Sequence, residues 1–264
     1  MMTNRGPAPT PLFALAVFLS LVLAAACCTL AGATPEQPGA GGSSDQFQAK
    51  FHEWNTLYKQ ALVGTNRPDA RADTLLSATN DALAAWLVVL DRFYESAPLV
   101  YAADANWQRD LATVTGYLEI ARRQLASGRV TQAHRALGPV RSALLDLRRR
   151  NGIAYYGDVL FEYHNAMERA CDPIIADPSS VTQAALPTIA GLVRDARTAW
   201  QRVLDFGFTP VDESEREKHC ELVAGETKAL QQLEAAVTSG DPASITSAAQ
   251  EVKAHYRDLY LAFG

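Results

Sequence analysis

Apolar residues recur at spacings of three and four along most of the chain after residue 46, with alanine, leucine, arginine and glutamine filling positions between them. This is the spacing of an α-helix that buries one face, and the filler residues favour helix. Turn sequences such as Ser127-Gly128 interrupt the pattern, and Asp241 before Pro242 is typical of a capped helix start. The pattern predicts eight helices, over residues 45–65, 70–96, 104–127, 129–151, 154–173, 179–206, 213–238 and 242–262.

The sequence pattern occurs twice, about 112 residues apart. An internal repeat of this kind indicates two related structural units, and short connections favour antiparallel neighbours. The sequence therefore predicts an all-α fold, a tandem duplication of an antiparallel four-helix bundle, with repeat 1 over 47–152 and repeat 2 over 153–264. Two separate bundles and one merged bundle both fit this pattern. The pairs that carry the repeat are Phe51-His52 with Tyr163-His164, Ala85-Trp86 with Ala199-Trp200, and Ser127-Gly128 with Ser239-Gly240.

The N-terminal residues have the composition of an export signal. Arg5 precedes an apolar run over residues 12–28, and small residues end at Ala33. Residues 1–33 are therefore predicted to be a cleaved signal peptide, and the Pro- and Gly-rich residues 34–46 a flexible linker. Lipid attachment at Cys27 and a retained membrane tether are the alternatives. The prediction places the protein in the periplasm or another extracytoplasmic compartment.

The formal net charge of −5 argues against nucleic acid as a partner, because nucleic acids bind basic surfaces. One local exception is Arg148-Arg149-Arg150. These residues are interpreted as cations that complement the negative end of a helix dipole. A site for an anion or an acidic partner is the alternative.

Removal of the signal leaves two cysteines, Cys171 and Cys220. An even number of cysteines in an oxidising compartment favours a disulfide. We therefore expect these two residues to pair, which would link the fifth helix to the start of the seventh. A free Cys171 that binds metal is the alternative.

The sequence contains no phosphate-binding glycine loop, nucleophile elbow, His-Glu-x-x-His zinc motif or covalent haem motif. His164 and Glu168 are spaced to form an acid–base pair, but no nucleophile accompanies them. The protein is therefore predicted not to be an enzyme.

The candidate chemistry lies in repeat 2. On the fifth predicted helix, His164, Met167, Glu168 and Cys171 are spaced to face one side, next to an apolar stripe. On the eighth, His255 falls within another apolar stripe and is expected to face the core. These five residues form a candidate metal site, and their soft donors suit copper. Buried histidines held by hydrogen bonds are the structural alternative.

Comparison of the repeats supports a site in the second copy. His255 aligns with Ala143, and Met167 aligns with Asn55. The two best ligand candidates therefore occur together in repeat 2 and are both absent from repeat 1.

The segments Asn165-Ala166-Met167-Glu168 and Ala254-His255-Tyr256-Arg257 give the second half a resemblance to a known family. This half resembles the small periplasmic b-type cytochromes of the four-helix class, in which a Met on the first helix and a His on the fourth hold haem. The resemblance covers roughly 100 residues and implies that Met167 and His255 ligate haem b. The duplication and the cysteines depart from the family pattern.

Together these features predict an exported periplasmic helical-bundle binding protein with a copper or haem b site in repeat 2, used for metal handling or electron transfer. A periplasmic protein or a metal donor would be its partner. The alternative is a structural or protein-interaction module without a cofactor.

Overall fold

The computed structural model describes residues 42–67 and 69–264, and over these residues the chain is all-helical. The predicted all-α fold with eight α-helices is confirmed. The predicted signal peptide and the first part of the predicted linker lie outside the described residues. The α-helices are α2 (Gly42–Gly64), α3 (Ala72–Phe93), α4 (Trp107–Ala126), α5 (Val130–Arg150), α6 (Tyr156–Ala176), α7 (Leu186–Phe206), α8 (Glu213–Ser239) and α9 (Pro242–Phe263). Two short 3₁₀ helices, η1 (Leu99–Tyr101) and η2 (Pro178–Ser180), lie in the connections.

The helix boundaries agree with the prediction within about three residues, except at the start of the helix predicted over 179–206. This helix begins only at Leu186, with Pro187 in its first turn, where the missing N–H costs no hydrogen bond. Residues 42–46, predicted to be linker, belong instead to α2, where Asp45 in the first turn complements the helix dipole. The predicted cap of the last helix is confirmed, since the Asp241 side chain accepts a hydrogen bond from the backbone N–H of Ser244.

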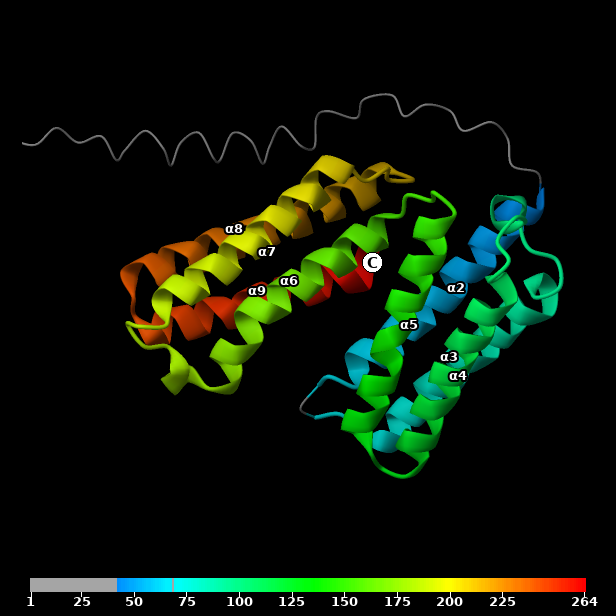
Figure 1. Cartoon of the computed structure of the whole chain (residues 1–264), viewed down its shortest axis with the longest axis horizontal. Coiled ribbons are helices and arrows are strands. Elements are labelled where there is room, and N and C mark those ends of the chain that lie inside the picture. The colour runs from blue at the N-terminus through cyan, green and yellow to red at the C-terminus, as the bar shows by residue number, and fades with distance from the viewer. Residues whose placement is uncertain (1–41, 68) are drawn as a thin grey trace, which may run out of the picture.

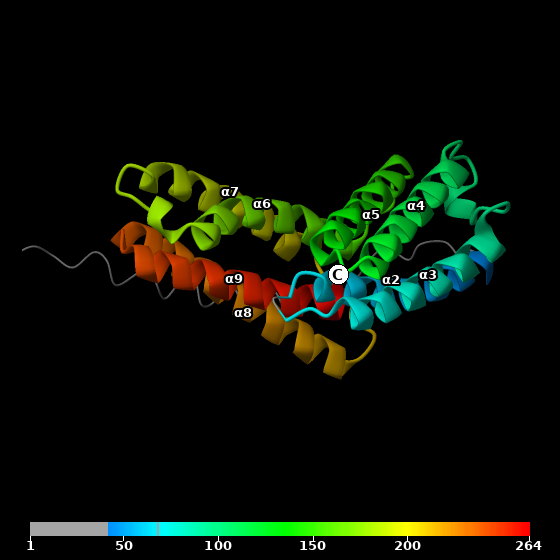
Figure 2. The same ribbon diagram turned by 90° about the horizontal axis from the view of Figure 1, so that it is seen from below.

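The helices segregate into two groups of four, α2–α5 and α6–α9, which lie side by side with inclined axes (Figure 1). The view from below shows the same two groups (Figure 2). Helices adjacent in the sequence pack against each other within each group. The buried apolar side chains of both groups nevertheless form one continuous core.

Each of the two groups contains a buried tryptophan that donates a hydrogen bond to a threonine. The indole N–H of Trp86 donates to the hydroxyl of Thr115 at 2.9 Å, and that of Trp200 donates to Thr227 at 3.0 Å. Both threonines also donate to a carbonyl four residues earlier in their own helix. Corresponding residues of the sequence repeat thus make corresponding contacts, while the duplication itself stays a prediction.

The two groups differ in how closely their first and last helices pack against each other. In the second group α6 packs closely along α9, whereas in the first group α2 and α5 contact each other only weakly. The second group packs against this open side through contacts of α9 with α2 and of α6 with α5. The C-terminus lies at this junction (Figure 1), where the Asn55 side chain donates to the carbonyl of Gly264.

A buried ion pair joins the two groups. The guanidinium of Arg148 on α5 donates to both carboxylate oxygens of Asp158 on α6, at 2.7 and 2.5 Å, and both side chains are about nine-tenths buried. Arg148, Arg149 and Arg150 lie in the last turn of α5, as the sequence predicted, and Arg148 pairs with Asp158 in addition. The junction withdraws Arg148 from water, and Asp158 supplies the counter-charge that burial demands.

Among the described residues, no helix is both long enough and apolar enough to cross a lipid bilayer.

Candidate functional site

A pocket of about 630 Å³ lies at the junction of the two helical groups, and we call it the junction pocket. It is formed by the C-terminal end of α2 and by α5, α6 and α9, the helices that meet where the first group is open. Its volume is within the range of small-molecule sites. Its apolar lining residues are Leu62, Val63, Met167, Ile175 and Ala254, and its ionisable ones are Arg67, Asp69, His134, Arg141, His164, Glu168, Lys253, Tyr256, Arg257 and Tyr260.

Arg141 enters this pocket from α5. Its guanidinium lies 4.5 Å from the ring centroid of Phe161 and 5.6 Å from that of Tyr260. Its Nε is shielded from solvent without a hydrogen-bond partner, and Arg141 has no ion pair within the described part of the chain. Burial opposes the charge, but neighbouring tyrosines and Glu168 outweigh burial and raise the pKa of Arg141. Arg141 is therefore a cation on which Glu168 acts at longer range but which has no carboxylate in direct contact.

His164 enters the pocket from α6. Its Nε2 lies 3.2 Å from a carboxylate oxygen of Glu168, and its ring stacks on Tyr256 with centroids 4.9 Å apart. Its Nδ1 is buried without a partner. Burial, and then the charges of Arg141, Lys253 and His134, lower the pKa of His164 well below its usual value. The imidazole is thus neutral at neutral pH, with Nε2 close to Glu168 and Nδ1 buried without a partner.

The hydroxyl of Tyr256 on α9 is a third buried polar atom without a partner. Arg141, His164 and Tyr256 all line the junction pocket. Buried polar groups are nearly always hydrogen-bonded in folded proteins, so three exceptions around one cavity indicate a place for polar atoms of a ligand. The set offers donors from Arg141 and Tyr256, together with a ring nitrogen of His164 whose role as donor or acceptor depends on its tautomer.

A second, very small cavity of about 20 Å³ also borders Arg141. This is enough room for one water molecule. A water there could satisfy the Nε hydrogen bond, but it would not neutralise the guanidinium charge. The missing carboxylate contact is therefore the feature of Arg141 that a solvent molecule does not explain.

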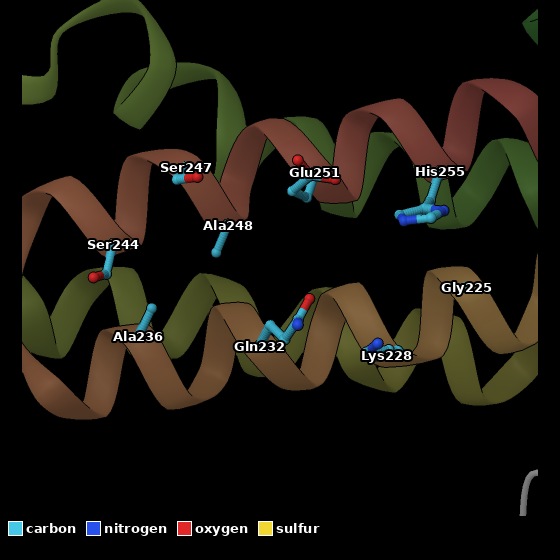
Figure 3. Close-up of a pocket in the computed structure, with 9 residues that line it drawn as sticks. All are labelled: Gly225, Lys228, Gln232, Ala236, Ser244, Ser247, Ala248, Glu251 and His255. Carbon is cyan, nitrogen blue, oxygen red and sulfur yellow. The ribbon is translucent and has the colours of Figure 1, made fainter.

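His255 lies on a different side of α9. It lines a polar groove of about 760 Å³ between α8 and α9, and Figure 3 shows it among side chains of both helices. A Cβ at Gly225 would lie 2.9 Å from the His255 Nδ1, so the absence of a side chain at Gly225 gives the imidazole its space. Met167, in contrast, lines the junction pocket. The structure does not bring Met167 and His255 together, and the pair does not fit a haem held between them.

Cys171 is fully buried in the core and is a free thiol. The expected disulfide with Cys220 is therefore wrong. Cys171 lies on α6, inside the second group, whereas Cys220 lines a separate pocket of about 580 Å³ beside the α7–α8 connection. Burial raises the pKa of Cys171 to about 12, which disfavours the thiolate that binds metals.

Of the five predicted ligands, the structure places His164, Met167 and Glu168 on the junction pocket and leaves Cys171 and His255 elsewhere. In residues 42–67 and 69–264, no group of three or more His, Cys, Asp or Glu side chains is arranged to hold a metal ion. Sequence reasoning missed Arg141 and Tyr256. The available signal was an arginine within the apolar spacing of Leu137, Val140 and Leu144 on one helix.

Comparisons of the chain with protein-family models, with curated proteins and with solved structures find no match.

Proposed function

We propose that this protein is an exported, non-catalytic binding protein that holds a small anionic ligand in the junction pocket. The observation that carries the proposal is the unpaired guanidinium of Arg141, beside the unpartnered hydroxyl of Tyr256. A buried charge is costly unless it is paired. A ligand anion would supply the missing partner and accept hydrogen bonds from both residues.

The electrostatics of the pocket favour an anion over a metal cation. The charges of Arg141 and Lys253 already disfavour a proton on His164, and the same potential would oppose a metal ion at its Nδ1. Lys59 adds a further buried cation near the pocket, with its Nζ 5.9 Å from the centroid of Tyr260. Burial lowers the pKa of Lys59 to about 8, so much of it still carries a positive charge at neutral pH. Copper and haem are therefore not the ligands that we propose.

The proposal is tested by calorimetry and thermal unfolding of the protein purified after export, in a buffer free of carboxylate and phosphate. Decanoate, citrate and inorganic phosphate serve as anionic probes. We expect at least one of them to bind and to raise the melting temperature, since a ligand at 100 times its Kd stabilises by about 2.7 kcal/mol. Arg141→Gln should abolish the effect. Arg135→Gln, an exposed arginine on the same helix, is the matched control.

Two further arms separate the alternatives. Haem b and copper are added to the same preparation, and absorbance spectra and metal analysis report their binding. Stoichiometric binding of either one, with no response to any anion, would replace the anion proposal by the cofactor prediction. No binding by any probe would leave a structural or protein-interaction module.

A further inference from the structure

We infer that the ligand of the junction pocket is an amphiphilic monocarboxylate, with its carboxylate between Arg141 and Tyr256 and its apolar chain between α6 and α9. This inference rests on the proposed function and specifies its ligand class. Charge balance, the shape of the groove and its lining carry it.

The charge balance indicates a single negative charge. Four lysines and arginines line the pocket, and three of them have carboxylate partners within the protein. Lys253 pairs with Glu168 at 3.7 Å and with Asp172, Arg67 pairs with Asp69 at 3.6 Å, and Arg257 pairs with Asp258 at 3.3 Å. Arg141 alone among the four has no such partner. The other three cations meet four carboxylates, which also offset Arg141 at longer range. Lys59, buried beside Tyr260, adds a fifth positive charge, so one unit is left for the ligand to balance.

The shape of the pocket indicates an elongated ligand. Lining residues extend along α6 from His164 to Ile175 and along α9 from Tyr260 to Gln250. At 1.5 Å rise per residue, these stretches are about 15 Å long. A volume of about 630 Å³ is far more than a carboxylate alone would fill. The ligand therefore has a body that continues beyond the charged group.

The lining indicates that this body is apolar. Beyond Arg141 and Tyr256, the groove presents the side chains of Leu62, Val63, Met167, Ile175 and Ala254. Met167 adapts readily to different apolar shapes, because its thioether chain is unbranched and flexible. Apolar surface buried against these residues would add affinity in proportion to chain length.

A series of straight-chain carboxylates tests the inference by calorimetry, below the concentration at which each one forms micelles. We expect affinity to rise about fourfold for each methylene group added between hexanoate and decanoate. Arg141→Gln should weaken every member by about 10- to 150-fold, whereas Arg135→Gln should leave them unchanged. Ala254→Phe fills part of the groove six residues along α9 from Tyr260, the α9 ring that the Arg141 guanidinium faces. It should abolish the gain with chain length and spare the weak binding of hexanoate.

The outcomes distinguish the inference from the proposed function. Two results would overturn the amphiphilic ligand and keep the anion site, provided that Arg141→Gln abolishes the binding. One is an affinity that does not depend on chain length, and the other is tighter binding of citrate or phosphate than of decanoate. Equal binding of decyltrimethylammonium and decanoate, unaffected by Arg141→Gln, would overturn both, because an apolar groove would then account for all binding. A response to none of these probes would also overturn both.

Discussion

Arg141 and Arg148 lie seven residues apart on α5 and both reach the junction of the two helical groups, but only Arg148 has a carboxylate partner. Residues seven apart on a helix project from nearly the same side. The same helix face thus carries one cation that the fold neutralises through Asp158 and one that it leaves unpaired. This difference underlies the proposed site.

The two arginines should differ in their effect on stability. Arg148→Met leaves the buried carboxylate of Asp158 without its partner and should lower the free energy of unfolding by about 3–5 kcal/mol. Arg141→Met leaves no carboxylate without a partner. It removes the cost of burying the guanidinium charge, and the loss of the cation–π contact with Phe161 offsets this gain. Its free energy of unfolding should change by less than about 1 kcal/mol. Urea denaturation without ligand measures both, and equal losses would show that Arg141 has a structural counter-ion.

Glu226 should make stability fall as the pH rises. Its side chain is fully buried, it accepts a hydrogen bond from Tyr163, and burial raises its pKa to about 8. Between about pH 4.5 and 8 the unfolded chain loses the proton while the folded protein keeps it, so the folded state is progressively disfavoured. The loss is on the order of a few kcal/mol.

Glu226→Gln keeps a hydrogen-bond acceptor for Tyr163 and removes this titration. Its free energy of unfolding should exceed that of the unaltered protein at pH 7.5, and the difference should shrink toward pH 4.5. Urea denaturation at several pH values gives both profiles. Parallel profiles for the two proteins would mean that Glu226 is ionised in the folded state.

Cys171 should be unreactive in the folded protein. Its thiol is fully buried and its pKa is raised to about 12 by burial, so thiolate is scarce and reagents lack access. Iodoacetamide at pH 8 should label the peptide containing Cys171 only after denaturation, as followed by mass spectrometry. The Cys171→Ala variant controls for labelling elsewhere. Rapid labelling of the native protein, or a peptide joined to Cys220, would contradict the packing of this core.

The two tryptophan–threonine hydrogen bonds should contribute to a similar extent. Thr115→Val and Thr227→Val each remove the acceptor of a buried indole N–H, and each should lower the free energy of unfolding by about 1–3 kcal/mol. Serine at either position keeps the hydroxyl and serves as the control. Because the sites lie in different helical groups, the double variant should show the sum of the two losses. A negligible loss at only one site would mean that the contacts are not equivalent.

The helices could be read from the sequence because their signals are local. Apolar spacing, glycine at turns and the Asp241 cap are contained within each segment, so most boundaries agree within a few residues. The exceptions are also local. The start of α7 comes late, with Pro187 in its first turn, and residues 42–46 extend α2 into the expected linker.

The site could be predicted only in part. The spacing of apolar residues shows which face of a helix is buried, but it does not show which other helix packs against that face. Successive residues project about 100° apart, so residues of one α9 segment can face different neighbours. Ala254 faces the junction pocket, whereas His255 faces α8, where Gly225 leaves room for it. The sequence placed His255 near the core but did not show which helix it would meet.

The sequence by itself determined the all-α class, most helix boundaries and the matched positions of Trp86 and Trp200, since these depend on residues close together or on repetition. Tertiary structure decided which charges would meet a partner. Because α2 and α5 contact each other only weakly, the first group is open on one side, and the second group packs there. This packing brings the carboxylate of Asp158 to Arg148 but brings no carboxylate into contact with Arg141. Burial and pairing of charge depend on contacts between distant segments, and no local pattern in α5 distinguishes the two arginines.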